Sequence, residues 1–537
     1  MQKQYDSVII GGGHNGLVCA FYLAKAGKTV RVLEARDVVG GAAVTEEFHP
    51  GFKNSVASYT VSLLNPKIIA DMDLHGHGLE IIERRVNNLW PQHEGDFLAF
   101  PVGFEKLKAE IALFSKHDAD NLERYFDDIE LVANLIRDML LETPPNAGSG
   151  FMEIFKAFKL GNRLRKLSLE EERVAVDIFT KSVSDFLDLY FENDLVKGAF
   201  AFDGVVGFYG SPHTPGSAYV LMHHAFGEVN GKKGVWGHAK GGMGSITQAM
   251  ARAAEGHGVE ISTSSPVAEV LIGDDDKAYG VRLANGEQVL GKTIVSNLNP
   301  KLLFGKLVDD KYQPDDFRNR IKHYKCGSGT FRMNVALDAL PQFTCLNEQS
   351  RATDDHLTGG IVIGESVEYL DKAFMSAKQN GWSDAPIVEM LIPSTLDDTL
   401  APAGKHVASL FCQQFAPDLG DGRSWDEPRS WDDHKEEAAD LIIATVDKYA
   451  PGFADSVLGR QILSPLDLER IFGLIDGDIM HGVLSLDQLF SNRPMLGHAH
   501  YRAPVKGLYM CGSGTHPGGG VTGAPGHNAA NEILKDI

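Results

Sequence analysis

The first residues of the chain carry the pattern that most restricts how it can fold. Residues 7–10 form a short, apolar and β-branched run, which is typical of a buried parallel strand. The run leads directly into three glycines, after which apolar residues recur at helical spacing as far as Gly27. A second apolar run, residues 29–33, ends at Glu34. This order predicts a β-α-β unit that opens a parallel sheet.

The glycines of this unit have the spacing of a dinucleotide-binding turn, Gly11-x-Gly13-x-x-Gly16. Such a turn lets backbone approach a pyrophosphate closely and lets the helix pack tightly on the strand. The N-terminus of the helix then offers unpaired N–H groups and a partial positive charge to the phosphates. The residues predicted to form this loop are Gly11, Gly13, His14, Asn15 and Gly16.

A second glycine loop follows the second strand. Glu34 lies eighteen residues after Gly16, where its carboxylate can accept hydrogen bonds from both ribose hydroxyls. Adjacent Gly40 and Gly41 would let the loop cross the far side of the pyrophosphate, and Arg36 can neutralise phosphate charge there. A site for a nicotinamide dinucleotide alone has no use for this loop. The residues predicted to bind here are Glu34, Ala35, Arg36, Gly40, Gly41 and Ala42.

The paired loops resemble the FAD-binding signature of the amine-oxidase and carotenoid-desaturase superfamily of flavoproteins. The glycine-rich stretch 508–526 is similar to the closing motif of the phytoene-desaturase type within it. The resemblance implies that the final helix, opening near Thr522, points its N–H groups at the pyrimidine edge of the flavin. It places Gly512 and Ser513 near the ribityl–phosphate part, Gly520, Val521 and Thr522 at the ring, and Val267 at adenine.

Other stretches resemble a narrower group, the pyridine nucleotide-disulphide oxidoreductase domain-containing protein 2 family. They are residues 211–217, 219–224, 241–244, 467–474 and 485–489. The family name suggests disulphide chemistry, but the five cysteines are scattered and no CxxC pair occurs. Scattered cysteines and the lack of a presequence favour a reduced, cytoplasmic compartment.

The predicted fold is α/β: a discontinuous, doubly wound, Rossmann-like FAD-binding domain with an inserted α+β substrate domain. We expect the FAD-binding domain to comprise residues 1–81, 228–300 and 476–537. The substrate domain then comprises a helix-rich segment, 82–227, and a second segment, 301–475. Long helical patterns over 103–142 and 164–198, with a stripe from Phe126 to Leu140, favour the helix-rich assignment.

Net charge limits the partners. The chain has 51 basic and 72 acidic residues, a formal charge of −21, which disfavours binding to nucleic acid. No apolar run approaches the roughly 18 residues of a membrane-spanning helix. The resemblance to carotenoid desaturases leaves weak peripheral membrane contact as an expectation, and the oligomeric state stays open.

Four histidines are the candidate acid–base groups: His213, His223, His224 and His481. A structural role is favoured for each, because a metal site needs ligand spacing that is not visible here, and none is predicted. A flavin enzyme also needs no dedicated base when the reacting C–H bond is aligned. Catalytic residues are therefore not assigned.

The predicted activity is that of an FAD-dependent oxidoreductase, with FAD bound non-covalently, that removes a hydride from a C–H or C–N bond of an apolar small molecule. Two alternatives stay open. One is a flavin-dependent isomerase or saturase that uses reduced FAD without net oxidation. The other is a binding protein of the Rab-GDP-dissociation-inhibitor type, which the intact flavin loops at both ends disfavour.

Overall fold

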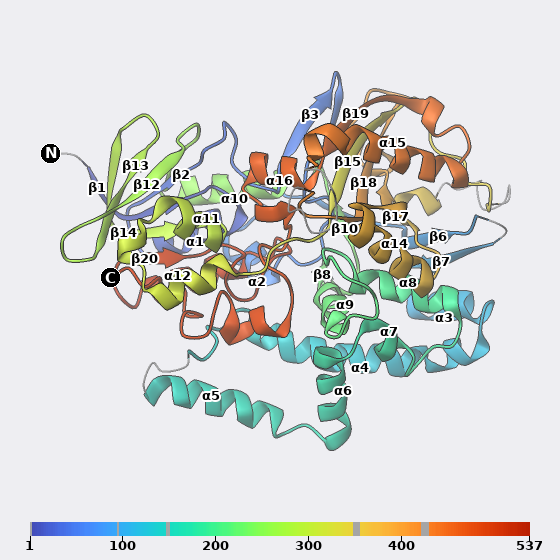
Figure 1. Ribbon diagram of the computed structural model, residues 1–537, viewed down its shortest axis with the longest axis horizontal. Coiled ribbons are helices and arrows are strands. Elements are labelled where there is room, and N and C mark those ends of the chain that lie inside the picture. Colours follow the sequence, from blue (N-terminus) through green and yellow to red (C-terminus); the bar gives the residue numbers. More distant parts are fainter. Residues whose placement is uncertain (1–2, 94–95, 147–150, 347–354, 420–428) are drawn as a thin grey trace.

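The predicted N-terminal β-α-β unit is present in the computed structural model of the chain, which describes residues 3–93, 96–146, 151–346, 355–419 and 429–537. Strand β1 (Gln4–Ile10) and strand β2 (Val30–Leu33) pair in parallel, and helix α1 (His14–Lys25) connects them. These elements start the first of two seven-stranded sheets, which lie at opposite ends of the molecule (Figure 1).

The first sheet gathers strands from three distant parts of the sequence. Its order is β11 (Glu260–Ser262), β2, β1, β14 (Gln288–Ser296), β13 (Ala278–Leu283) and β12 (Val267–Ile272). A last strand, β20 (Leu508–Met510), pairs in parallel with the carboxyl end of β14. Residues from near both ends of the chain thus share one sheet, and both termini lie on its side of the molecule (Figure 1).

Both faces of this sheet are buried, which explains the continuous apolar runs of its strands. Ile9, Val32 and Val295 pack with α1, α10 (Gly244–Gly256) and α17 (Ala524–Ile533) on one face. Val8 and Ile294 pack on the other face with the π-helix η2 (Leu303–Leu307) and helix α12 (Asp315–Lys322). The sheet is therefore doubly wound, and the predicted α/β class is confirmed.

Residues 301–322, expected at the start of the second substrate segment, pack on the first sheet through Leu303, Phe304 and Phe317. A helical segment directly after a strand such as β14 can cover the sheet from which it emerges, and the sequence does not show which sheet it covers. We propose the same five segments, with the second substrate segment beginning after α12.

The second sheet is mainly antiparallel; only the β16–β6 pair is parallel. Its order is β19 (Val457–Leu463), β15 (Phe331–Leu337), β18 (His406–Phe415), β17 (Trp382–Leu391), β16 (Gly360–Ile363), β6 (Val86–Pro91) and β7 (Phe97–Pro101). Helix α15 (Trp431–Tyr449) packs on the face that carries Met333 and Val388. The opposite face, through Ile387 and Phe411, packs on a layer of helices.

The helices of this layer are shorter than predicted, because each of the two predicted helical stretches is divided. The stretch 103–142 is two helices, because Ser115 caps the N-terminus of α4 by accepting a hydrogen bond from the Asp118 N–H group. The stretch 164–198 is divided in the same way by caps at Ser182 and Asn193. The helices are α3 (Phe104–Ala112), α4 (Lys116–Leu140), α5 (Phe151–Leu164), α6 (Leu169–Thr180), α7 (Val183–Leu187), α8 (Asp194–Ala201) and α9 (Ser217–Ala225).

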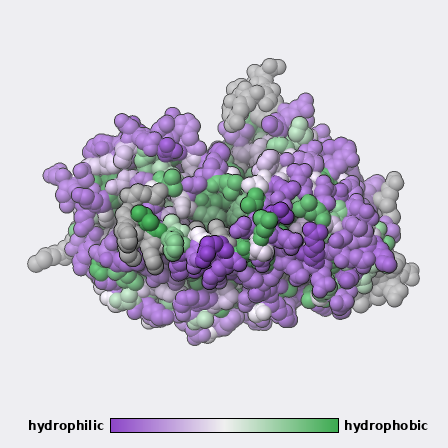
Figure 2. All heavy atoms as spheres, turned by 90° about the horizontal axis from the view of Figure 1, so that it is seen from below, coloured by the Kyte–Doolittle hydropathy of each residue, from purple (hydrophilic) through white to green (hydrophobic). Residues whose placement is uncertain are grey.

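Phe126 departs from the predicted stripe, because 36% of its surface is exposed while the rest of the stripe is buried. Apolar side chains are also exposed on α5 and α6, at Ile154, Phe158, Leu169 and Val176. These helices lie at the bottom of Figure 1, on the face that Figure 2 shows, where the surface is otherwise largely hydrophilic. Within the described ranges, no helix combines the length and apolar character that crossing a bilayer requires.

Further helices and strands complete the fold. The helices are α2 (Pro66–Asp71), α11 (Pro300–Leu302), α14 (Val367–Asn380) and α16 (Pro465–Phe472). The strands are β3 (Thr45–His49), β4 (Phe52–Ser55), β5 (Ile81–Glu83), β8 (Glu228–Val229), β9 (Lys232–Lys233) and β10 (Gly237–Ala239). The short 3₁₀-helices include η1 (Phe202–Gly204) and η7 (Ile475–Gly477).

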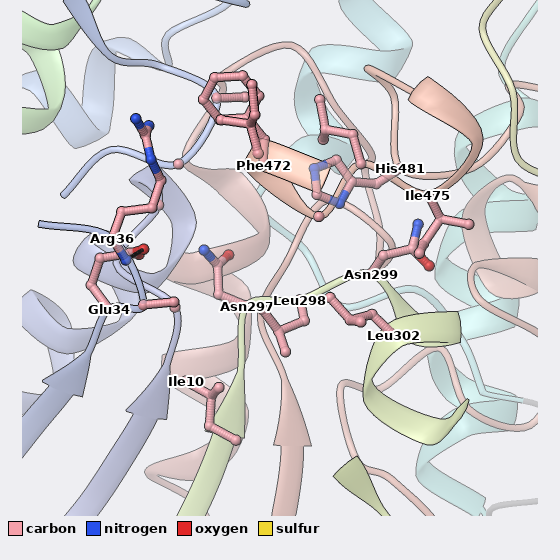
Figure 3. A pocket seen from close by; sticks show the side chains of 18 of the residues that line it. Ile10, Glu34, Arg36, Asn297, Leu298, Asn299, Leu302, Phe472, Ile475 and His481 are labelled. Atoms are coloured by element: carbon pink, nitrogen blue, oxygen red, sulfur yellow. Dashed lines mark hydrogen bonds between the residues drawn. The ribbon is translucent and has the colours of Figure 1, made fainter. Parts of the chain in front are cut away.

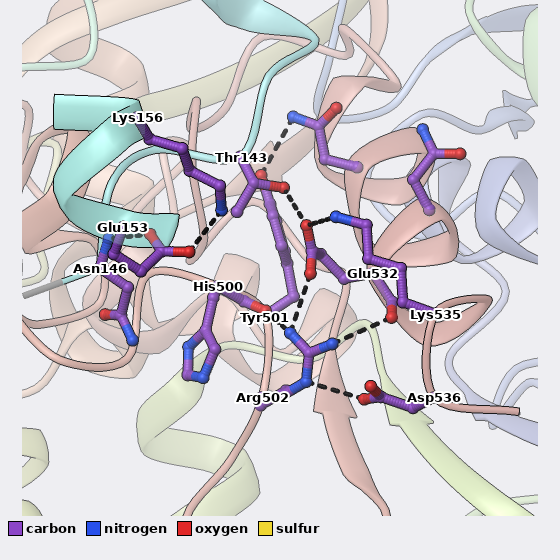
Figure 4. Close-up of polar contacts among 12 residues, drawn as sticks. Thr143, Asn146, Glu153, Lys156, His500, Tyr501, Arg502, Glu532, Lys535 and Asp536 are labelled. Carbon is purple, nitrogen blue, oxygen red and sulfur yellow. Dashed lines mark hydrogen bonds and ion pairs between the residues drawn. The ribbon is translucent and has the colours of Figure 1, made fainter. Parts of the chain in front are cut away.

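The C-terminal helix is anchored by a polar cluster (Figure 4). The Arg502 guanidinium donates hydrogen bonds to Glu532, at 2.9 Å, and to Asp536, at 2.8 Å. The Thr143 hydroxyl donates to the same Glu532 carboxylate at 2.7 Å and so ties the end of α4 to α17. A buried carboxylate shared by three segments fixes where α17 lies.

We predict that Gly526→Ala destabilises the fold, because a Cβ at this position of α17 would lie 2.2 Å from the Asn15 carbonyl oxygen of α1. Overpacking of this kind destabilises proteins by about 1–3 kcal/mol, measurable as a lower urea midpoint. The matched control is Gly256→Ala at the end of α10, where nothing lies within 4 Å of an added Cβ. The control should be neutral or slightly stabilising. Equal effects of the two substitutions would contradict the tight contact.

Candidate functional site

A cavity of about 480 Å³ lies where the strands of the first sheet end. Ile10, Leu33 and Asn297 line it from the carboxyl ends of β1 and β2 and from the residue after β14. In doubly wound sheets this edge is where ligands bind. Glu34 and Arg36 lie at one end of the cavity and His481 at the other (Figure 3).

The structure brings most of the predicted binding residues to this cavity. It is lined by Gly11, Gly13, His14, Asn15, Glu34, Ala35, Arg36, Gly40, Gly41, Ala42, Val267 and Ser513. The N-terminal, middle and C-terminal stretches singled out in the sequence therefore face one space.

The two glycine loops of the N-terminal region are joined by backbone. The Gly40 N–H group donates a hydrogen bond to the Gly12 carbonyl at 2.9 Å. Gly40 has φ +132°, a conformation that side chains rarely adopt, and a Cβ there would lie 2.6 Å from the Ala43 carbonyl oxygen. Only glycine fits at this junction, which gives the second loop its predicted path beside the first.

Glu34 and Arg36 are placed by specific contacts. The Glu34 carboxylate accepts hydrogen bonds from the N–H groups of Gly12, at 2.7 Å, and Arg36, at 2.9 Å. The Arg36 guanidinium pairs with Glu46 and lies over the Phe472 ring, 5.1 Å from its centroid. Its buried Nη1 atom has no hydrogen-bond partner within the described residues.

The C-terminal stretch meets helix α1 at the cavity. The Asn15 amide nitrogen donates a hydrogen bond to the Ser513 hydroxyl at 3.0 Å, and both side chains are buried. The Asn15 amide oxygen has no partner in the described part of the chain. One polar contact thus joins the predicted phosphate loop to the predicted closing motif.

Three predicted residues support the cavity without lining it. A Cβ at Gly16 would lie 2.3 Å from the Gly11 carbonyl oxygen. A Cβ at Gly512 would lie 2.5 Å from the Asn297 carbonyl oxygen. The Thr522 hydroxyl accepts a hydrogen bond from the Ala524 N–H group at the start of α17. These residues set close backbone packing and a helix start.

A smaller chamber of about 130 Å³ adjoins the cavity, and we call it the inner chamber. Both spaces are lined by His14, Ala42, Leu474, His481 and Ser513. Gly520 and Val521 line the inner chamber but not the larger cavity, and the same is true of the aromatic residues Tyr59, Trp236 and Phe411. An added Cβ at Gly520 would meet Leu63 at 2.5 Å, so a side chain there would strike the chamber wall.

Two histidines stand at the junction of the two spaces. Burial, with a contribution from the nearby His481, lowers the pKa of His14 to about 3. Burial and the charge of Arg493 lower the pKa of His481 to about 4. Both imidazoles are therefore neutral at physiological pH. His14 Nε2 and His481 Nδ1 have no hydrogen-bond partner among the described residues.

A buried cation lies behind the junction. The Arg493 side chain is fully buried and donates hydrogen bonds to the carbonyls of Met480, Gly482, Gln488 and Ser513, at 2.7 to 3.3 Å. No carboxylate pairs with it in the described ranges. The arrangement fixes the chain on both sides of the inner chamber and leaves a positive charge there.

These features fit a bound FAD. The glycine loops and the α1 N-terminus suit a pyrophosphate, and Glu34 suits a ribose. Buried polar atoms of His14, Asn15, Arg36 and His481 lack partners in the described structure. Such atoms normally find a partner, so a polar ligand along the cavity accounts for them.

The four candidate histidines separate into different groups. His213 is exposed and lines neither space, whereas His481 lines both. His224 lines the inner chamber, and its neighbour His223 is buried against Phe226.

Three residues that line the cavity were not predicted from the sequence: Asn297, Leu298 and Asn299. Their position directly after the strand β14 could have identified them. Residues 467–474 were singled out in the sequence without a predicted location. Phe472 and Leu474, from this stretch, line the cavity.

Comparisons with known proteins agree with a flavin cofactor. Residues 16–331 match the family described as flavin containing amine oxidoreductase. The chain is 40% identical to the pyridine nucleotide-disulfide oxidoreductase domain-containing protein 2 of Rattus norvegicus, across all of this chain and 94% of that protein. It is 24% identical to one of the subunits of limonene dehydrogenase from Castellaniella defragrans, across all of this chain and 95% of that protein.

A solved structure, wild-type putrescine oxidase bound to putrescine, shares the fold. It aligns with TM-score 0.57 and 15% identity over all of this chain and 99% of its own. The matched family model, the 40% identical relative and the fold agree with one another. The chain therefore belongs to the flavin-containing amine oxidoreductase family and is an FAD-dependent oxidoreductase.

Proposed function

We propose that this oxidoreductase removes a hydride from a C–H or C–N bond of an apolar small molecule held in the inner chamber. FAD, when bound, supplies the two-electron acceptor for such a reaction. The observation that supports this proposal most directly is that the cavity suited to FAD adjoins the inner chamber, with which it shares the lining residues His14, His481 and Ser513. A substrate in that chamber would lie beside the end of the cavity opposite Glu34.

The residues proposed to hold FAD follow the cavity from end to end. Glu34 would hold the adenosine ribose and Val267 would contact adenine. The backbone of Gly11 to Asn15 and of Gly40 to Ala42 would surround the pyrophosphate, with Arg36 supplying positive charge. Ser513, Gly520 and Val521 would lie along the flavin end, where the α17 N-terminus favours negative charge on the ring.

The walls of the inner chamber support an apolar substrate. They include Leu63, Val206, Ile479 and Met480 besides the aromatic residues named above. Such walls exclude water, which strengthens the electrostatic effect of Arg493 and the α17 N-terminus. The neutral imidazoles of His14 and His481 can donate or accept hydrogen bonds but are poor general acids.

The reaction class is tested by anaerobic reduction of the purified holoenzyme. A panel of amines, alcohols and polyenes is added separately, and flavin absorbance near 450 nm is followed while the products are identified. We expect at least one compound to bleach the flavin and to yield a product two electrons more oxidised. An isomer formed over repeated turnovers by enzyme whose FAD has first been reduced chemically, with no net change in the flavin, would instead support the isomerase alternative.

The cofactor assignment is tested by Glu34→Gln. Charge-assisted hydrogen bonds contribute roughly 1.5–3 kcal/mol each, so loss of the charge should weaken FAD binding at least about tenfold. Retention of FAD after dialysis and titration of the apoprotein measure the effect. Glu269→Gln is the control, because this carboxylate lies on the exposed hairpin strand β12 and pairs with Arg282. Equal FAD retention in the two variants would remove the role of Glu34.

A further inference from the structure

A third cavity, of about 420 Å³, lies on the side of the inner chamber that the FAD site does not occupy, and we call it the outer cavity. Strand β6 and helices α4, α8 and α9 supply most of its walls. It shares two lining residues with the inner chamber, His224 and Trp236. The two spaces therefore meet at this pair of side chains.

The His224–Trp236 pair has the geometry of a partition. The rings are stacked, with centroids 6.2 Å apart and planes inclined by 27°. His224 Nδ1 lies 2.8 Å from the Val220 carbonyl, which fixes the imidazole on α9. Trp236 directly precedes Gly237, whose N–H group donates to the Val61 carbonyl beside the chamber at 2.8 Å. One ring is thus held by a helix and the other by a short segment between strands.

The inner part of the outer cavity is aromatic. Trp90, Phe100, Tyr125 and Phe200 line it, and Trp90 is only 3% exposed. The Trp90 indole N–H group has no hydrogen-bond partner among the described residues. A buried tryptophan normally finds such a partner, so this group is available to a ligand in the cavity.

Asp203, in η1 between α8 and α9, is an acidic residue that lines this cavity. Its carboxylate forms no hydrogen bond or ion pair within the described part of the chain. Two other acids line the cavity: Glu130 pairs with Arg137 and Lys233, and Asp127 is exposed on α4. Burial, and secondarily the charge of Glu389, raises the pKa of Asp203 to about 7.

We propose that the outer cavity is the second half of the substrate site and that Asp203 binds an ammonium group on an elongated substrate. The apolar body of such a molecule would pass beside the His224–Trp236 pair into the inner chamber. The reacting bond would then lie at the FAD site, and the ammonium group would lie away from it. This assignment rests on the proposed function, since it takes the inner chamber as the place of reaction.

Charge and shape support this occupant. In a poorly solvated cavity, a carboxylate is stabilised most by a cation that also donates hydrogen bonds to it. An anion would meet Asp203 with Asp127 and Glu130 nearby on the same walls, and a wholly apolar ligand would leave the Asp203 carboxylate unpartnered. An alkyl chain with one ammonium end satisfies the aromatic walls and the carboxylate together.

The test uses the FAD-loaded enzyme and three probes of equal chain length: decylamine, decanol and decanoate. Binding is read at pH 8 from the change in the flavin absorption spectrum, without requiring reduction. We expect decylamine to bind most tightly to the wild type. Asp203→Asn should weaken decylamine binding about tenfold or more while changing decanol binding by about twofold at most.

Two further variants complete the test. Asp120→Asn removes a carboxylate from the exposed side of α4, outside the cavity, and should leave all three affinities unchanged. Trp236→Ala should alter the binding of decylamine and decanol alike, because both chains pass the partition. Asp203→Asn must retain FAD and its melting temperature; if it does not, Asp203→Ser replaces it with the same expected loss.

Either of two results overturns the assignment. One is a wild type that prefers decanoate or decanol, or binds none of the probes. The other is an Asp203 variant that binds decylamine as the wild type does. Failure of the proposed function is separate, because it appears as an absence of flavin bleaching by any oxidisable compound. If the probes bind as expected but no compound bleaches the flavin, the assignment of the outer cavity stands and only the proposed reaction is contradicted.

Discussion

The close contact between helices α1 and α17 is the constraint on which the cofactor site depends. Gly526 brings α17 against the Asn15 carbonyl, and the Asn15 side chain reaches Ser513. Strand β20 pairs beside β14, which in turn pairs with β1. The site therefore joins residues almost 500 positions apart in the chain, and its closure must follow the long-range pairing of the first sheet.

Arg493 performs a related task at the end of the cavity proposed to hold the flavin ring. A buried cation is normally paired with a carboxylate, but this guanidinium has carbonyl partners on both sides of the inner chamber. Its positive charge contributes to the lowered pKa values of His223 and His481, whose main cause is burial. The same charge favours an anionic ring, so one side chain fixes the local backbone and sets the local potential.

The sequence was most informative where backbone geometry allows few residues. Gly16 and Gly40 have neighbours that exclude a Cβ, so the loops could be predicted from their spacing alone. The position of Phe472 over Arg36, and of His481 opposite Glu34, depends on how the second sheet packs beside the first. No local pattern encodes that packing. The same holds for residues 301–322 and for the partition formed by His224 and Trp236.

The net charge of −21 is, by its sign alone, unfavourable to a cofactor that carries a pyrophosphate. Screening limits that effect, because charges beyond about 8 Å contribute little at physiological ionic strength. Within the cavity the α1 N-terminus, Arg36 and Lys306 present positive potential, while Glu34 lies where hydroxyls are expected. Arg36 is itself paired with Glu46, so the helix N-terminus and the glycine backbone carry more of the phosphate binding than composition suggests. Local geometry, and not the sum of charges, decides which ligand the first sheet can hold.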